Sequence, residues 1–141
     1  MKTILLIDHD PVNTIRISEI LQQAGRRLLH APDAKQGMRI LRDEDPGLVI
    51  YHLPENRRNT HKTLQPTLEA LSARNIALLC VMGRRDSRGA APEILGPKQY
   101  LVKPFSRDEL LRAVEDHLEH ENRERAISAH GRHQGPELKL R

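Results

Sequence analysis

Aromatic residues, cysteines and long apolar runs are all scarce in this chain. Its 141 residues include two tyrosines, one phenylalanine and no tryptophan, so the core of the protein must be built from Leu, Ile, Val and Ala. A single cysteine, Cys80, excludes a disulfide framework and is typical of a reducing compartment. The apolar run after Met1 is too short for a secretory signal or a membrane span. The sequence therefore predicts one cytoplasmic domain that makes no contact with a membrane.

Most of the positive charge lies near the C-terminus. The whole chain carries a net charge of +4, and residues 123–141 hold five Lys or Arg against two Glu. A folded nucleic-acid reader concentrates basic residues on one face of its domain, whereas this excess follows a segment without apolar periodicity. We expect a basic, mobile tail or linker over residues 122–141, and no nucleic-acid binding by the domain itself.

Strand-like apolar runs alternate with helical patterns over residues 1–121. The runs predict strands at 3–7, 28–31, 48–52, 76–82 and 99–102. The helical patterns predict helices at 11–24, 33–41, 64–73 and 106–121, and a short one at 91–95. Asp33 is expected to cap its helix, Ser106 to open a capping box with Glu109, and Pro66 to occupy a first helical turn.

This alternation predicts an α/β fold with a parallel sheet covered by helices on both faces. In such a sheet, ligands bind beyond the carboxyl ends of the strands, where the strand order switches. The predicted site therefore takes in the residues at those ends, which are Asp8, His9, His52, Met82, Gly83 and Lys103.

Three motifs carry a resemblance to a known family. They are Ile4–Pro11, the stretch Asp33–Leu41 followed by Pro46–Leu53, and Tyr100–Phe105. In order and separation they resemble the response-regulator receiver domains of bacterial two-component signalling. The resemblance implies a doubly wound, flavodoxin-like fold with five parallel strands in the order 2-1-3-4-5. It also implies a cis peptide bond between Lys103 and Pro104.

The resemblance implies a degenerate phosphorylation site. In the family, two acids after the first strand hold Mg²⁺, an aspartate ending the third strand accepts the phosphoryl group, a Thr or Ser ends the fourth, and a lysine precedes the proline. Asp8 and Lys103 match this pattern, whereas His9, His52 and Met82 replace the second acid, the acceptor and the hydroxyl residue. Because an acyl phosphate requires a carboxylate and Mg²⁺ prefers oxygen ligands, we expect no Mg²⁺, no other cofactor and no catalysis.

The surviving polar residues allow other interpretations. Lys103 is expected to form an ion pair with Asp8 in place of the metal. Alternatively, Asp8, His9 and His52 could form an N,N,O site for zinc or nickel, although their spacing is not a recognised metal signature. Phosphorylation of His52 itself is a further alternative. The other histidines, including His117, His120, His130 and His133, are expected to face solvent.

These observations favour a pseudo-receiver that acts by contact with a protein partner or as a homodimer. Tyr100 stands where the family places a switch aromatic, and it either joins an interaction surface or packs at the edge of the last strand. One alternative is a ligand or transition-metal sensor that uses the altered cleft. Another is the N-terminal regulatory domain of a transcription regulator or nucleotide-signalling enzyme, since residues 137–141 could begin a further domain.

Overall fold

Five parallel strands form one sheet in the computed structural model, which describes residues 2–53, 60–83 and 99–119. The strands are β1 (Thr3–Ile7), β2 (Arg27–Ala31), β3 (Leu48–His52), β4 (Ala77–Met82) and β5 (Tyr100–Val102), in the order β2-β1-β3-β4-β5. The helices are α1 (Pro11–Gln23), α2 (Ala34–Asp43), α3 (Thr60–Ala73) and the C-terminal helix over residues 107–119. The predicted doubly wound fold and strand order are confirmed.

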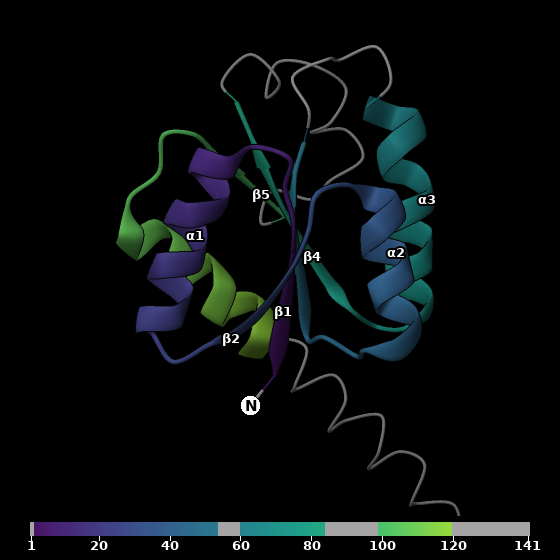
Figure 1. Ribbon diagram of the computed structural model, residues 1–141, viewed down its shortest axis with the longest axis horizontal. Coiled ribbons are helices and arrows are strands. Elements are labelled where there is room, and N and C mark those ends of the chain that lie inside the picture. Colours follow the sequence, from purple (N-terminus) through teal and green to yellow (C-terminus); the bar gives the residue numbers. More distant parts are fainter. Residues whose placement is uncertain (1, 54–59, 84–98, 120–141) are drawn as a thin grey trace, which may run out of the picture.

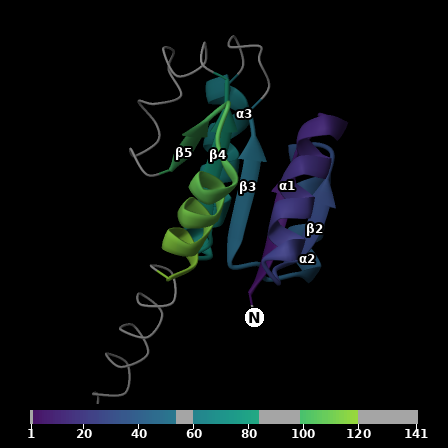
Figure 2. The same ribbon diagram turned by 90° about the vertical axis from the view of Figure 1, so that its left-hand side faces the viewer.

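The sheet separates two aliphatic cores, and the helices cover it from both sides (Figures 1 and 2). α1 and the C-terminal helix pack on one face, where Ile17, Leu21, Leu110 and Val114 are fully buried. α2 and α3 pack on the other face over Leu41, Leu64 and Leu71. Because both faces of the sheet are covered, all five residues of β3 are buried.

Polar side chains begin the helices where the sequence predicts. The Asp33 carboxylate accepts a hydrogen bond of 2.8 Å from the Gln36 N–H at the start of α2. Ser106 and Glu109 form the predicted capping box, with reciprocal hydrogen bonds of 2.9 and 3.0 Å. The predictions for Asp33 and Ser106 are confirmed.

The prediction for Pro66 is wrong. α3 begins at Thr60, four residues before the predicted start, so Pro66 lies inside the helix. An interior proline removes one helical hydrogen bond and costs about 3 kcal/mol. Leu64 and Leu71 are almost completely buried against the sheet, and each such burial contributes about 1.5–3 kcal/mol. The packing of the apolar face therefore outweighs the local preference of proline for a first turn.

A glycine lets α2 approach the end of β1. A Cβ atom at Gly37 would lie 2.6 Å from Ile7 Cδ1 and 2.9 Å from Ile7 Cγ1. Ile7 is buried, and its side chain would have to shift to admit a Cβ atom at position 37. Gly37 thus sets the distance between α2 and the strand that leads to Asp8.

The predicted tail at 122–141 and the short helix at 91–95 lie outside the described residues. Within the three described ranges, no helix has both the length and the apolar character needed to cross a bilayer.

Candidate functional site

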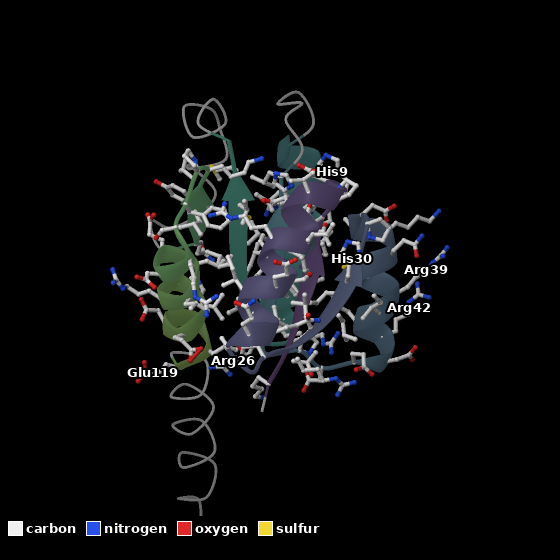
Figure 3. All side chains as sticks on the ribbon, turned by 60° about the vertical axis from the view of Figure 1, so that its left-hand side comes forward. His9, Arg26, His30, Arg39, Arg42 and Glu119 are labelled. Atoms are coloured by element: carbon white, nitrogen blue, oxygen red, sulfur yellow. The ribbon has the colours of Figure 1, made fainter. Side chains whose placement is uncertain are left out.

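The strand order brings most of the predicted site residues to one end of the sheet. β1 and β3 are neighbours, with Ile7 beside Tyr51, so Asp8 and His52 follow as adjacent positions. Asp8 is 2% exposed and His52 is 4% exposed. His9, in contrast, is exposed near the start of α1 (Figure 3).

The Asp8 carboxylate is the centre of a hydrogen-bond network. Oδ1 accepts from the Asp10 backbone N–H at 2.9 Å and from His52 Nδ1 at 2.8 Å. Oδ2 accepts from the Asn13 side-chain amide at 2.8 Å. In addition, the Asp8 carbonyl oxygen lies 2.9 Å from Nε2 of His30, which comes from β2. Both carboxylate oxygens therefore have protein donors.

The pKa of Asp8 is lowered below its ordinary value of 3.8. Burial by itself raises this pKa, but hydrogen bonds from His52, the Asp10 backbone and Asn13 stabilise the carboxylate and prevail. Asp8 is therefore an ionised side chain with little exposure to solvent.

His52 stands between Asp8 and Lys103. Lys103 Nζ lies 2.9 Å from His52 Nε2, and His52 Nδ1 lies 2.8 Å from Asp8 Oδ1. Among the ion pairs of the described residues there is none that joins Lys103 directly to Asp8. The predicted direct ion pair is wrong because the imidazole occupies the space between the two charges.

The two neighbours of His52 determine its tautomer. An ammonium group has no acceptor, so Lys103 must donate to a lone pair on Nε2. The proton of the neutral ring then lies on Nδ1 and is donated to Asp8. The resulting chain of carboxylate, neutral imidazole and ammonium pairs every buried polar atom of His52.

Contacts with β4 and α1 hold the segment that carries Lys103. The Lys103 N–H donates to the Met82 carbonyl oxygen at 2.8 Å, and the Lys103–Pro104 peptide bond is cis, as the resemblance implies. The Arg16 guanidinium lies 4.8 Å from the centre of the Phe105 ring and donates to the Phe105 carbonyl oxygen. These contacts place the Lys103 ammonium against His52.

Three predicted residues lie in other surroundings. Met82 is fully buried with Tyr51 and Cys80 in the core under α2 and α3, so it presents no polar group to the site. Tyr100 is half-buried and packs against the same core. His117 is half-buried, and its Nδ1 lies 2.7 Å from the Ala113 carbonyl oxygen, so the prediction that it faces solvent is wrong.

Sequence reasoning missed Asn13, His30 and Arg16 as members of this network. Asn13 is buried one turn into α1, where its amide reaches Asp8. In the sequence, Asn13 stands four positions before Ile17, on the apolar face of the predicted helix. A polar residue at such a position was a usable signal, because a buried polar group needs a hydrogen-bond partner. No spacing in the sequence connects Arg16 to Phe105, because their contact joins segments 89 positions apart.

The donor set does not fit Mg²⁺, the metal that the receiver resemblance implies. Mg²⁺ requires oxygen ligands in near-octahedral geometry, and among the described residues of the cluster Asp8, His9 and His52, only Asp8 offers a carboxylate. Both of its oxygens are already bonded to protein donors. Imidazoles occupy the positions that the resemblance assigns to the two other acids, so these three side chains do not suit Mg²⁺.

A softer metal is chemically better matched. Asp8, His9 and His52 each offer one ligand atom, and these atoms lie within 4.8 Å of one another. The rings of His9 and His52 are stacked, with centroids 5.4 Å apart and planes inclined by 15°. A metal ion lies close to the plane of each imidazole that binds it, and two stacked, nearly parallel planes do not meet at the site. The exposed His9 would therefore have to turn to share a metal ion with His52.

Comparison with known proteins agrees with this fold. No family model matches the chain. It is 23% identical over 115 residues to the protein PilH of Pseudomonas aeruginosa, covering 81% of this chain and 95% of PilH.

Two solved structures are similar to the chain along most of its length. A response regulator receiver domain protein from Clostridium thermocellum has a TM-score of 0.72 at 21% identity, covering 90% of this chain and 99% of that one. The signal receiver domain of an HD domain-containing protein from Pseudomonas fluorescens has a TM-score of 0.69 at 25% identity, covering 86% and 97%. This chain therefore has the receiver fold.

Proposed function

We propose that this chain is a receiver-like signalling module of a two-component or related pathway that forms no aspartyl phosphate and acts by contact with other proteins. The observation that carries the proposal is the Asp8–His52–Lys103 chain. Where a receiver needs a free carboxylate, this protein has an imidazole bonded at both nitrogens. The receiver fold and the similarity to PilH support the signalling part of the proposal.

The same contacts disfavour phosphorylation of His52 itself. Its Nδ1 carries the proton bonded to Asp8, its Nε2 lone pair accepts from Lys103, and the side chain is 4% exposed. A phosphodonor would have to displace Lys103 before it reached a nitrogen lone pair. The buried thioether of Met82 supplies no hydroxyl to bond a phosphoryl oxygen.

Incubation of the protein with acetyl phosphate or phosphoramidate and Mg²⁺ is expected to leave its intact mass unchanged. The reason is that neither a carboxylate nor an open imidazole nitrogen is available at position 52. Intact-mass spectrometry checks this, with a phosphorylatable receiver domain in the same tube as the positive control. A single stable phosphate that maps to the 48–53 peptide would overturn the proposal.

Exposed apolar side chains beside the site support the contact role. Val12 is 76% exposed and Ile15 is 58% exposed, and both belong to α1, which begins next to His9. Large apolar residues at the rim of a site commonly mark a protein-binding surface. Tyr100 remains a candidate for a second contact, although its packing against the core also accounts for its position.

The clustering of Asp8, His9 and His52 favours a second candidate, a transition-metal sensor. Lys103 opposes this function. A metal on His52 Nε2 would displace the Lys103 ammonium, and a metal on Nδ1 would send the ring proton to Nε2, where it would face that ammonium. Metal binding therefore requires Lys103 to leave the imidazole.

Lys103→Met is accordingly expected to raise the affinity for Zn²⁺ about tenfold, the order of effect of groups that contact metal ligands. Isothermal titration with Zn²⁺ measures this, and His9→Ala and His52→Ala should each abolish the gain. His117→Ala is the matched control because His117 lies on the C-terminal helix, outside the ligand group. A lack of Zn²⁺ binding in both the wild type and Lys103→Met would exclude the sensor function.

The chain can also be one part of a larger regulator. The similar receiver domain from Pseudomonas fluorescens belongs to an HD domain-containing protein. This likeness supports an attached output domain for the present chain, and the reading frame of the native gene tests it.

A further inference from the structure

Charge is unevenly distributed between two helices on opposite faces of the sheet. α2 carries three cations, Lys35, Arg39 and Arg42, against one acid, Asp43. The C-terminal helix carries five acids against two arginines within residues 107–119. α2 and the C-terminal helix flank the sheet from opposite sides (Figure 1). On the two sides of the sheet, α2 is therefore a basic helix and the C-terminal helix an acidic one.

The three cations of α2 form one stripe. Lys35, Arg39 and Arg42 follow one another at i, i+4 and i+7, and all three are exposed. Arg39 and Arg42 point away from the body of the protein in Figure 3. Across the described ranges, no hydrogen bond or ion pair engages any of these three side chains.

Two acids that follow α2 are already paired with other cations. Glu44 lies 4.0 Å from Arg27, and Asp45 lies 3.5 Å from Arg74. Arg74 also donates to backbone carbonyl oxygens at the end of α2, including that of Glu44 at 3.0 Å. Within the described ranges, no acid forms an ion pair with a cation of the α2 stripe.

The acidic side has a pair of matching geometry. Asp116 and Glu119 are exposed and stand three positions apart near the described end of the C-terminal helix. Arg39 and Arg42 are also three positions apart on α2. Residues at this spacing lie on the same face of a helix, about 5–6 Å apart. The two pairs can therefore meet when two helices cross.

We propose that the α2 stripe of one molecule docks on the acidic end of the C-terminal helix of a second copy, so that the chain associates head to tail. The two surfaces differ and lie on opposite faces, so the contact is heterologous and each copy keeps one free surface of each sign. The association is weak and sensitive to salt because exposed ion pairs are screened. This inference deepens the proposed contact function by naming the partner.

A nucleic acid fits the stripe less well. The eight residues from Lys35 to Arg42 extend over about 10 Å of helix, which is room for only a few phosphates. Affinity for nucleic acids grows with the number of phosphates neutralised. Asp33 and Asp43 also lie at the two ends of α2, where they repel a polyanion that extends past the stripe.

Sedimentation velocity over a range of concentrations of the full chain tests the proposal. In about 20 mM salt, the weight-average sedimentation coefficient of the wild type is expected to rise with concentration, and in about 300 mM salt the rise should disappear. The variants R39E/R42E and D116K/E119K should each lose the rise. An equimolar mixture of the two should recover it, because each altered surface then meets an oppositely charged one.

The control R57E/R58E changes the net charge by the same amount as R39E/R42E but alters neither α2 nor the C-terminal helix, so its self-association should equal that of the wild type. A wild type that stays monomeric at low salt overturns the proposal. So does a mixture that fails to recover association, or a gel shift with duplex DNA that R39E/R42E abolishes while self-association is unchanged. None of these results depends on phosphorylation. The intact-mass experiment therefore tests the proposed function independently of this association.

Discussion

Asp8→Ala is expected to lower the free energy of unfolding by about 3 kcal/mol. The substitution removes the buried acceptor of the hydrogen bonds from His52 and Asn13. Lys103 then contacts an imidazole that has lost its carboxylate partner. Removing one partner of a buried charged pair costs about 3–5 kcal/mol. The partial exposure of Lys103 lets that side chain recover contact with water, which places the expected value at the lower end.

Urea denaturation of Asp8→Ala beside Asp10→Ala measures this effect. Asp10 belongs to the same turn, but its carboxylate caps α1 by accepting from the Val12 N–H at 3.0 Å near the surface. Loss of such a cap costs about 1 kcal/mol. Equal losses of unfolding free energy in the two variants would show that the contacts of Asp8 with His52 and Asn13 add no stability beyond that of a helix cap.

The contribution of Asp8 should depend on pH in a defined direction. Its folded-state pKa lies below 3.8, so the folded protein holds the carboxylate ionised more strongly than the unfolded chain does. The stabilisation is therefore complete above about pH 4 and is lost as the pH falls through the folded-state pKa. The difference in unfolding free energy between the wild type and Asp8→Asn is expected to be constant near neutral pH and to shrink below about pH 4.

A double variant, His9→Asp/His52→Asp, is expected to gain phosphorylation by acetyl phosphate in the presence of Mg²⁺. The two substitutions place three carboxylates around the position of Asp8 and leave Lys103 beside residue 52. Oxygen ligands then suit Mg²⁺, and residue 52 offers a carboxylate to the phosphodonor. Met82 is left unchanged because its side chain fills the core under α2 and α3.

Intact-mass spectrometry with and without Mg²⁺ measures the gain. His9→Asp/His52→Asn is the matched control, since asparagine has the shape of the aspartate in the double variant but lacks its nucleophilic carboxylate. Phosphorylation of the control would place the reaction elsewhere in the chain. A folded double variant that binds Mg²⁺ but accepts no phosphoryl group would show that the imidazole of His52 is not the reason why the wild type forms no phosphate.

Local sequence patterns predicted the fold because each element follows from its own residues. The apolar runs at 3–7 and 48–52 coincide with β1 and β3, since strands buried on both faces consist almost entirely of apolar residues. Asp33 and Ser106 begin their helices by bonding backbone groups three positions away. Pro66 was mispredicted because burial of Leu64 and Leu71, a tertiary effect, decides that α3 continues through it.

The candidate site was only partly predictable for the same reason. Sequence order placed Asp8, His52 and Lys103 at strand ends, and the resemblance identified His52 as the replacement of the acceptor carboxylate. The donors Asn13 and His30 come from elements that no local pattern links to Asp8. Their part in the site depends on how α1 and β2 pack beside β1.

The amino-acid sequence alone determined the alternation of strands and helices, the strand order implied by the resemblance, and the replacement of an acceptor carboxylate by an imidazole. These are properties of residue identity and short-range spacing. Only the tertiary structure decided that the imidazole separates Asp8 from Lys103 and pairs with both. Those three residues are far apart in the chain, and the distances between their side-chain atoms arise only when the strands pack into one sheet.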